Sequence, residues 1–403
     1  MAGSNDNQRV IAVVGAGLAG LRTLEALRRQ GWQERVVVVG EETHMPYTRP
    51  PLSKKLLIDG GTHADVALRM RPSEHETQWR LGRGVVASDL ANRMLRLDDG
   101  TTLRYDGLVA ASGVRPRRLP DSVGGPRQVI RTVDDALAVS ARLTPGTRVV
   151  VIGAGFIGCE VAAAATVRGC AVAVVAVDAV PMQTPLGRLL GTELRRRHAA
   201  AGVEFHLGTG VARVDGERVR LADGSVLRAD VVVEAIGSVP RTEWLAGNDL
   251  DLTDGVRCDG WLRMGGRRGV VAVGDVARFP NPLFGDDARR VEHWQVAADS
   301  AAHAATTLVH DLEGVAPAPG PFTTVPTFWS DQGVVRIRAF GLPRLGDRCA
   351  VLEGDLTGEA AIGYHSNDAL VGVVLLGMAR QSSTYLRHLT EELAKAKPGS
   401  EAQ

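Results

Sequence analysis

Two glycine-rich turns are the features of this chain that most directly indicate chemistry. Each has three glycines that follow an apolar, β-branched run and precede a helical pattern: Gly15, Gly17 and Gly20 in the first, and Gly153, Gly155 and Gly158 in the second. The first glycine turns the chain sharply, the second lets the backbone approach a phosphate, and the third lets the helix pack closely on the strand. The N-terminus of such a helix attracts a pyrophosphate. Two such motifs predict two bound dinucleotides, which is typical of a flavoprotein that takes hydride from a nicotinamide.

Acidic residues stand where they could complete these sites. Glu41 follows the apolar run Val36–Gly40, about 20 residues after the last glycine of the first motif, a spacing at which a carboxylate accepts hydrogen bonds from ribose hydroxyls. Asp178 follows the second motif at a similar distance. Asp275 follows a further apolar run, Val270–Gly274. The spacing therefore predicts a contact from Glu41 to the ribose hydroxyls of the first dinucleotide, and Asp178 and Asp275 are further candidate acids.

The composition is that of a globular protein with more than one domain. A chain of 403 residues is longer than one hydrophobic core usually supports. Its contents of 44% hydrophobic and 23% charged residues are usual for a globular protein. A formal net charge of +1 argues neither for nor against a charged partner, and because no basic tract or nucleic-acid motif appears, we expect no nucleic-acid partner.

Cysteine and histidine usage excludes other kinds of chemistry. The four cysteines form no CxxC pair, and no Cys/His set has the spacing of a zinc site, so we expect no disulfide framework and no metal. The polar N-terminus lacks the apolar core of a signal peptide, and the apolar run Ala369–Ala379 is too short to cross a bilayer and predicts a buried strand. We therefore expect a cytoplasmic protein that contacts no membrane.

The order of apolar runs predicts the architecture that positions these residues. Strands alternating with helices from Val10 to about Ala110 predict a parallel sheet covered on both faces, and the run Val270–Asp275 predicts a later strand of the same sheet. A helix is expected over Thr132–Leu143, before the second glycine motif. A linker with Pro317, Pro319 and Pro321 then leads to a segment that ends in a helix over Ser382–Lys395.

Short motifs along the chain occur in the order of one enzyme family. Together with the two glycine turns they are Arg49–Lys54, Gly274–Asp275, Glu292–Gln295 and Phe328–Gln332. In these motifs the chain resembles the FAD-dependent NAD(P)H:ferredoxin reductases of the putidaredoxin reductase and biphenyl-dioxygenase ferredoxin reductase type. Those enzymes serve bacterial cytochrome P450s and ring-hydroxylating dioxygenases through a small iron–sulfur ferredoxin, and the resemblance covers almost the whole chain.

The resemblance implies a glutathione-reductase-like α/β fold: two Rossmann-like dinucleotide-binding domains and a C-terminal α+β domain. On this basis residues 1–115 and 247–320 would form the FAD-binding domain. Residues 116–246 would form an inserted NAD(P)H-binding domain, and 321–403 the C-terminal domain.

The resemblance also assigns roles to individual side chains. It places Lys54 beside the flavin N5 edge, where a cation stabilises negative charge on reduced flavin. Its expected partner is Glu160, because a buried lysine without a partner tends to lose its proton, whereas Lys55 is expected in solvent. Further implied contacts are the FAD ribityl hydroxyls for Asp275, the FAD phosphates or flavin edge for Arg49, and walls of the flavin or nicotinamide site for Trp294 and Trp329.

Three positions depart from the family pattern. NADH-preferring members usually carry an acid at the end of the second strand of the second domain, where a count from Gly169 finds Ala176. Asp178 could substitute, and no arginine follows at once to hold a 2′-phosphate, so we expect NADH, with NADPH possible. Ser112 replaces a usual threonine, and Thr327 replaces a frequent aromatic residue.

Other activities remain open from the sequence. A related flavin reductase could use rubredoxin, monodehydroascorbate or oxygen as its acceptor, and a flavoprotein like apoptosis-inducing factor could act as a ligand-controlled binding module. A disulfide reductase is disfavoured because no CxxC follows Glu41, and a cysteine peroxidase because no cysteine precedes Cys159.

Overall fold

The computed structural model describes residues 8–70, 75–316 and 320–395, so Pro317 and Pro319 of the expected linker lie outside the described residues. The chain divides into two compact units. Unit 1 comprises Met1–Thr48, Ala67–Arg115 and Val239–Pro326, and unit 2 comprises Arg49–Val66, Pro116–Ser238 and Thr327–Gln403. Each unit is described by itself.

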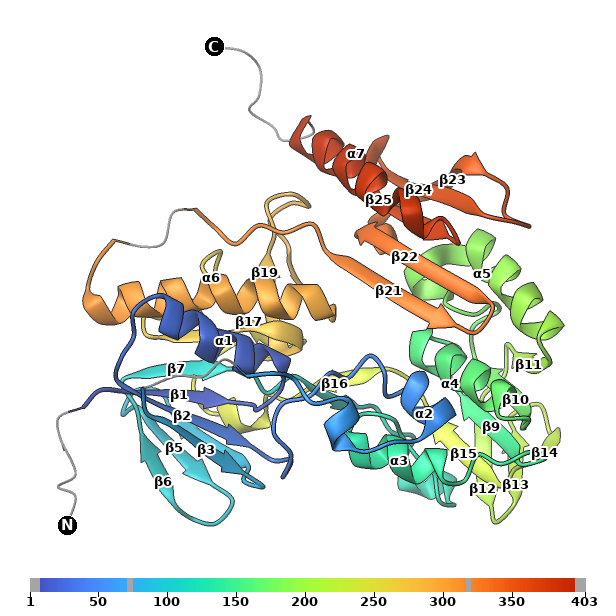
Figure 1. Ribbon diagram of the computed structural model, residues 1–403, viewed down its shortest axis with the longest axis horizontal. Helices are drawn as coiled ribbons and strands as arrows, with labels where there is room; N and C mark the ends of the chain where they lie inside the picture. The colour runs from blue at the N-terminus through green and yellow to red at the C-terminus, as the bar shows by residue number, and fades with distance from the viewer. Residues whose placement is uncertain (1–7, 71–74, 317–319, 396–403) are drawn as a thin grey trace. The chain divides into compact units, whose positions relative to one another are not determined.

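Unit 1 is built on a five-stranded parallel sheet (Figure 1). Its strands, in spatial order, are β18 (Val270–Ala272), β7 (Gly107–Ala110), β1 (Val10–Val14), β2 (Arg35–Gly40) and β3 (Thr77–Leu81). Helices α1 (Leu18–Arg29) and α6 (Trp294–Glu313) pack against each other and against strands of this sheet. The order reverses between β1 and β7, and ligands of such sheets bind at this point, outside the carboxyl ends of the strands. The prediction that Val270–Asp275 returns to the first sheet is confirmed.

The expectation of alternating strands and helices up to Ala110 is wrong for part of unit 1. An antiparallel meander occupies this stretch, with β4 (Val85–Asp89), β5 (Met94–Leu97) and β6 (Thr102–Arg104). Leu95 and Leu97 are buried and Arg96 between them is exposed, which is the two-residue period of a strand with one wet face. A second antiparallel group contains β19 (Ala277–Pro280) and β20 (Ala288–Arg290), beside β17 (Val256–Arg257).

Unit 2 contains a second parallel sheet of the same type. Its strands, in spatial order, are β11 (Val203–Leu207), β10 (Ala171–Ala176), β9 (Arg148–Ile152) and β15 (Val231–Glu234). Val150 and Ile152 of this sheet share a core with an antiparallel meander, made of β12 (Val211–Asp215), β13 (Arg218–Leu221) and β14 (Val226–Arg228). The helices are α2 (Lys55–Asp59), α3 (Val133–Ser140), α4 (Phe156–Val167) and α5 (Gln183–Ala200). Helix α3 lies within the predicted helix and is capped by Thr132 and Asp135.

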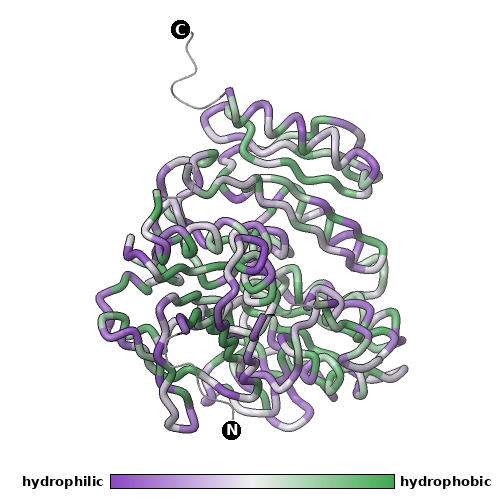
Figure 2. The backbone as a smooth tube through the Cα atoms, turned by 60° about the vertical axis from the view of Figure 1, so that its left-hand side comes forward, coloured by the Kyte–Doolittle hydropathy of each residue, from purple (hydrophilic) through white to green (hydrophobic). Residues whose placement is uncertain are grey.

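The C-terminal segment of unit 2 is a five-stranded antiparallel sheet with one helix. Its strands, in spatial order, are β21 (Thr327–Gln332), β22 (Val335–Gly341), β25 (Ala369–Leu376), β24 (Ala360–Ser366) and β23 (Arg348–Gly354). Helix α7 (Ser382–Lys395) has the predicted bounds and packs on β25. Leu186 and Leu190 of α5 share a core with Ile337 and Leu376 of this sheet. Figure 2 shows the hydrophobic stretches along the strands of the sheets and polar residues in the connections.

The α/β class with two dinucleotide-binding sheets and a C-terminal sheet and helix is therefore confirmed. The short strands β8 (Val114–Pro116) and β16 (Ser238–Pro240) stand where the chain passes from one unit to the other. The contacts group the chain into two units, and the expected three-domain division stays a prediction. Among the described residues, no helix is long and apolar enough to cross a membrane.

Candidate active site

In the first glycine turn, backbone segments approach each other too closely to leave room for a side chain. A Cβ at Gly15 would lie 2.1 Å from the carbonyl oxygen of Ala111, and a Cβ at Gly20 would lie 2.0 Å from that of Gly15. Gly15 also has φ +121°, which a side chain rarely permits. Both glycines are therefore required for the strand, the turn and α1 to meet in this way.

Gly17 is different, because nothing lies within 4 Å of where its Cβ would be. It is the N-cap residue of α1, no side chain caps the helix there, and the first turn contains no acidic residue. The amides that begin α1 thus face an open space without a competing side chain, as a pyrophosphate requires. These residues fit the FAD phosphates that the sequence predicts here.

The second turn, in unit 2, repeats the first. Gly153 has φ +106°, a Cβ there would lie 2.3 Å from the Ala235 carbonyl oxygen, and a Cβ at Gly158 would lie 2.0 Å from that of Gly153. Gly155 is open and is the N-cap residue of α4, again without a side-chain cap. The second turn therefore fits a second pyrophosphate by the same construction.

Glu41 lies at the carboxyl edge of the first sheet and is paired with Arg241, which the sequence analysis missed. Arg241 forms an ion pair with the Glu41 carboxylate. Its backbone N–H donates to the Gly113 carbonyl at 3.0 Å, and its carbonyl accepts from Ser112 Oγ at 2.7 Å. Because a carboxylate has about four acceptor positions, this pairing leaves capacity for a ribose hydroxyl. The signal available was the turn over 235–240, which resembles the turn after Leu108 and runs directly into Arg241.

Asp275 lies close to the helix that follows the first glycine turn, and Trp294 begins the helix that packs beside Gly274. Asp275 is in a short 3-10 helix that starts at Gly274, where a Cβ would lie 2.9 Å from that of Ala19 in α1. The Gly274 N–H donates to Ser300 Oγ of α6 at 3.1 Å, and Trp294 is the first residue of α6. Unit 1 thus brings Asp275 and the start of α6 to the edge where Gly15, Gly17 and Gly20 lie.

The predicted pair of Lys54 and Glu160 is confirmed within unit 2. Lys54 Nζ lies 2.8 Å from Glu160 Oε1, and the two side chains are 18% and 3% exposed. Ser53 Oγ donates to Glu160 Oε2, and Ser330 Oγ donates to Oε1 at 2.5 Å. A buried carboxylate that accepts from a cation and two hydroxyls is well compensated. Lys55, by contrast, is exposed, as expected.

Arg49 and Trp329, two further predicted site residues, also lie in unit 2. Arg49 donates a hydrogen bond to the Arg131 carbonyl. Trp329 is 39% exposed and alternates along β21 with the buried residue Ser330. Their roles toward a flavin or a nicotinamide stay predictions.

The hydrogen bonds of the two sheets show which residue of unit 2 corresponds to Glu41, and they do so more closely than counting residues along the sequence. The Gly15 N–H donates to the Val39 carbonyl, and the Gly153 N–H donates to the Val175 carbonyl in the same way. The residue two positions further is Glu41 in unit 1 and Val177 in unit 2. Val177 is 76% exposed, whereas Ala176 is buried at the end of β10. Asp178 is one residue beyond the counterpart of Glu41.

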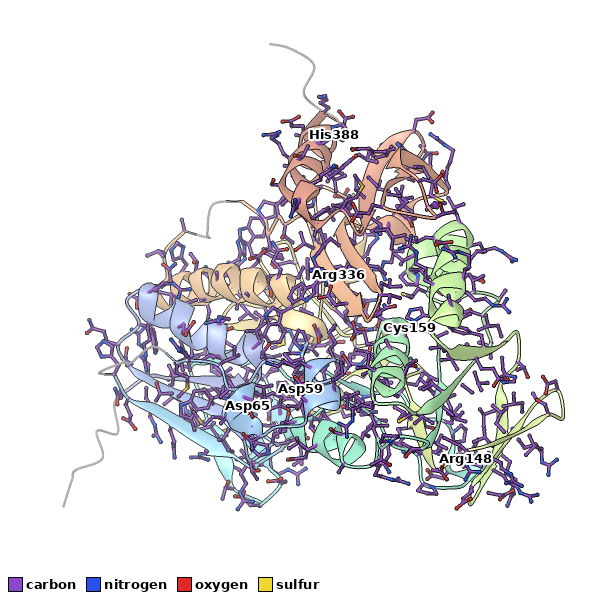
Figure 3. The ribbon with its side chains drawn as sticks, turned by 45° about the vertical axis from the view of Figure 1, so that its right-hand side comes forward. Asp59, Asp65, Arg148, Cys159, Arg336 and His388 are labelled. Atoms are coloured by element: carbon purple, nitrogen blue, oxygen red, sulfur yellow. The ribbon has the colours of Figure 1, made fainter. Side chains whose placement is uncertain are left out.

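The cysteines are not placed for redox chemistry. All four are free. Cys159, labelled on α4 in Figure 3, is buried, and burial raises the pKa of its thiol to about 12. Within the described ranges, no group of three or more histidine, cysteine or acidic side chains could hold a metal ion. A thiolate nucleophile therefore has no support in this structure.

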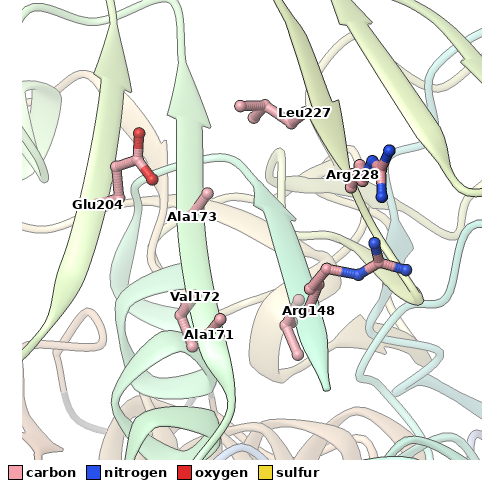
Figure 4. A pocket seen from close by; sticks show the side chains of 8 residues that line it. Arg148, Ala171, Val172, Ala173, Glu204, Leu227 and Arg228 are labelled. Carbon is pink, nitrogen blue, oxygen red and sulfur yellow. The ribbon is translucent and has the colours of Figure 1, made fainter. Parts of the chain in front are cut away.

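A hollow of about 200 Å³ in unit 2, shown in Figure 4, lies away from the glycine turn. It includes Arg148 and Ala171, the first residues of β9 and β10, whereas Gly153 follows the last residue of β9. Ligands of parallel sheets bind at the carboxyl ends of the strands. This hollow is therefore separate from the predicted dinucleotide site.

Comparisons with known proteins agree with this geometry. The model of the pyridine nucleotide-disulphide oxidoreductase family matches residues 9–301. The ferredoxin–NAD(+) reductase component of the p-cumate 2,3-dioxygenase system of Pseudomonas putida is 36% identical over 355 residues, which cover 87% of this chain and 85% of the relative. The corresponding anthranilate 1,2-dioxygenase component of Burkholderia cepacia is 38% identical over 351 residues, covering 85% and 84%.

A solved structure also matches over nearly its whole length. The crystal structure of a covalent putidaredoxin reductase–putidaredoxin complex gives a TM-score of 0.88 at 29% identity and covers 96% of this chain and 94% of that chain. The chain therefore belongs to the pyridine nucleotide-disulphide oxidoreductase family, and within it to the ferredoxin reductases that these relatives represent. The resemblance found in the sequence and the oxidoreductase class are confirmed.

The surroundings of the glycines predict a binding defect for a substitution at Gly17 and a stability defect for one at Gly20. Gly17→Ala adds a methyl group into open space, so the protein should fold with an unchanged melting temperature but bind FAD at least about tenfold more weakly. Gly20→Ala drives a methyl group onto a backbone oxygen and should lower the melting temperature itself. Thermal unfolding of the apoprotein and FAD titration measure the two effects. Gly155→Ala is the matched control and should keep FAD affinity while weakening the nicotinamide; loss of FAD in that variant would show that the two turns are wrongly assigned.

The register predicts that Val177 decides how strongly the second site rejects a 2′-phosphate. Val177→Glu should raise the ratio of kcat/KM for NADH over NADPH by about tenfold or more, because a like charge there repels the phosphate. Val167→Glu, an equal change at an exposed position on α4, serves as the control for added charge. An unchanged ratio in Val177→Glu would mean that the side chain at this position does not approach the ribose.

Proposed function

We propose that this protein is an NADH-dependent reductase of a small [2Fe–2S] ferredoxin that serves a cytochrome P450 or a ring-hydroxylating oxygenase. The observation that carries the proposal is the duplicated glycine turn, because two turns with the same backbone crossings and open helix N-termini suit two dinucleotides. The relatives support the acceptor, since they are ferredoxin–NAD(+) reductase components of dioxygenase systems.

When bound, FAD would supply the redox chemistry, which is hydride uptake from the nicotinamide and one-electron release to the ferredoxin. The chain's own residues bind and orient. The N-terminus of α1, with Glu41 and Asp275 as hydroxyl acceptors, holds FAD, and the N-terminus of α4 holds the nicotinamide dinucleotide. The resemblance also assigns binding roles to Arg49, Trp294 and Trp329. No side-chain nucleophile takes part.

Lys54 acts electrostatically in this proposal. Its ammonium group is directed by Pro50 and Pro51 and held by Glu160 at 2.8 Å. A cation fixed in advance stabilises negative charge that develops on the flavin, without reorganisation at that moment. Glu160 keeps the cation in place and acts through it.

NADH is the proposed donor. The counterpart of Glu41 in unit 2 is the apolar Val177, Ala179 and Val180 supply no cation for a 2′-phosphate, and Asp178 lies nearby. NADPH is rejected only weakly in this arrangement, because no carboxylate occupies the position of Glu41.

The cytoplasm is the proposed location, since all four cysteines are free. Residues 1–115 with 247–320, 116–246, and 321–403 are the proposed FAD-binding, NAD(P)H-binding and C-terminal domains.

Stopped-flow reduction of the FAD-loaded protein tests the function directly. NADH should bleach the flavin absorbance faster than NADPH does, and added ferredoxin should reoxidise it within turnover. Acid release should give FAD in about one-to-one ratio to protein. Faster reoxidation by rubredoxin, monodehydroascorbate or oxygen than by any ferredoxin would assign a different acceptor. Absence of turnover with all of them would favour a binding module.

Lys54→Met should slow reduction of the flavin by NADH about tenfold or more while leaving FAD bound, because the lost charge matters most when the flavin becomes negative. The fold should survive, since Ser53 and Ser330 still donate to Glu160. Lys55→Met is the matched control, with the same change in charge at an exposed neighbour. Glu160→Gln should have a milder effect, and the double variant should resemble Lys54→Met. Normal reduction rate and flavin potential in Lys54→Met would remove this lysine from the mechanism.

A further inference from the structure

Buried polar side chains of unit 2 form an unbroken line of hydrogen bonds that ends on Glu160. His198 on α5 contacts Gln332 Oε1 at 2.8 Å, Gln332 Nε2 contacts Ser330 Oγ at 2.9 Å, and Ser330 Oγ contacts Glu160 Oε1 at 2.5 Å. His198, Gln332 and Ser330 are each 1% exposed.

The direction of every hydrogen bond follows from the carboxylate. Glu160 accepts, so Ser330 gives its only proton to it, and the Ser330 oxygen must itself accept. The Gln332 amide therefore turns its NH₂ toward Ser330, and its NH₂ also contacts Met182 Sδ at 3.6 Å. The Gln332 oxygen then faces His198, which must donate from Nε2–H. All donors on the line point toward the negative charge of Glu160, an arrangement in which each bond strengthens the next.

This line cannot conduct protons. Gln332 lies in its middle, and a carboxamide has no readily transferred proton at neutral pH. Burial lowers the pKa of His198, so its ring is a neutral donor rather than a second cation near Lys54. The line can hold the carboxylate in place but cannot change its charge.

The alternation of β21 explains how the strand supplies two members of the line. Ser330 and Gln332 are two residues apart and lie on the buried face, whereas Trp329 and Asp331 lie on the other face. Asp331 pairs there with Arg338 at 2.9 Å. The C-terminal sheet thus reaches the Lys54–Glu160 pair through one face of its first strand.

We propose that Ser330, Gln332 and His198 are positioning residues that fix the Glu160 carboxylate, and through it the ammonium group of Lys54, for electron uptake by the flavin. The proposal rests on the proposed function of Lys54. It gives the C-terminal segment a part in tuning the flavin, in addition to its own fold. It also predicts a fixed Nε2–H tautomer for His198, a property that needs no turnover to observe.

Ser330→Ala and Ser330→Thr form the first test. The alanine variant should reduce its flavin with NADH about threefold more slowly, a smaller effect than that of Lys54→Met, with a more negative flavin midpoint potential and an unchanged KM for ferredoxin. The threonine variant keeps a hydroxyl and should restore both values. In the Lys54→Met background, Ser330→Ala should have no further effect on the rate, because Ser330 acts through the lysine.

Gln332→Met and the histidine tautomer form the second test. Nitrogen-15 NMR of histidine-labelled apoprotein should show His198, identified by comparison with His198→Gln, as the Nε2–H tautomer with a slowly exchanging proton. Gln332→Met should abolish that protection and slow flavin reduction, as Ser330→Ala does. Asp331→Asn, on the opposite face of the same strand, is the matched control and should change neither.

The outcomes separate this proposal from the function on which it rests. If Lys54→Met slows reduction but Ser330→Ala and Gln332→Met lower only the melting temperature, the three residues are structural and the positioning role is overturned. It is equally overturned if Ser330→Ala slows reduction in the Lys54→Met background, or if His198 is the Nδ1–H tautomer. A Lys54→Met variant with normal kinetics overturns the function of the lysine and, with it, any action of Ser330 through that lysine.

Discussion

Both dinucleotide-binding sheets depend on one constraint, the close crossing of backbone segments at a glycine. Gly15 and Gly153 lie against the backbone carbonyl of the residue that follows the neighbouring strand. Gly20 and Gly158 lie against the carbonyl of the first glycine in their own turn. A methyl group at any of these four places would meet a carbonyl oxygen at 2.0 to 2.3 Å. The remaining glycines of the motifs, Gly17 and Gly155, are free of this constraint, and their openness points to a ligand rather than to packing.

Unit 2 adds a second constraint, the compensation of a buried negative charge. A buried charge is costly unless ion-pair and hydrogen-bond partners compensate it. The Glu160 carboxylate therefore draws polar partners from two other parts of unit 2. Ser53 and Lys54 contact it from the segment before α2, and Ser330 contacts it from β21. This arrangement joins Arg49–Val66 and the C-terminal sheet to the second parallel sheet, in the same grouping that the contacts give.

The sequence predicted those parts of the fold and site that short motifs and local periodicity encode. The glycine turns, the return of Val270–Asp275 to the first sheet and the bounds of α7 follow from such local patterns, whereas the pairing of Lys54 with Glu160 was predicted from the family resemblance. The antiparallel strands over 85–104 were missed because their runs are short and resemble the rest of an α/β pattern. Arg241 was missed because its partner Glu41 lies 200 residues away in the sequence. The line from His198 to Glu160 was likewise invisible, since it joins residues from α5, β21 and α4 that only tertiary packing brings together.

The neighbours Cys159 and Glu160 show why the redox chemistry of this chain belongs to its cofactors. Both side chains are buried at the start of α4, in the same weakly polarisable surroundings. Burial favours the neutral form of any acid. The thiol donates to the Ala154 carbonyl at 3.6 Å, and burial raises its pKa to about 12. The carboxylate next to it has the Lys54 ammonium and two hydroxyl donors. Glu160 is therefore compensated by a cation and two hydroxyl donors, whereas burial keeps the Cys159 thiol protonated. A thiol held protonated is a poor nucleophile, so Cys159 offers no nucleophile of its own, although the chain belongs to a family named for disulphide reduction.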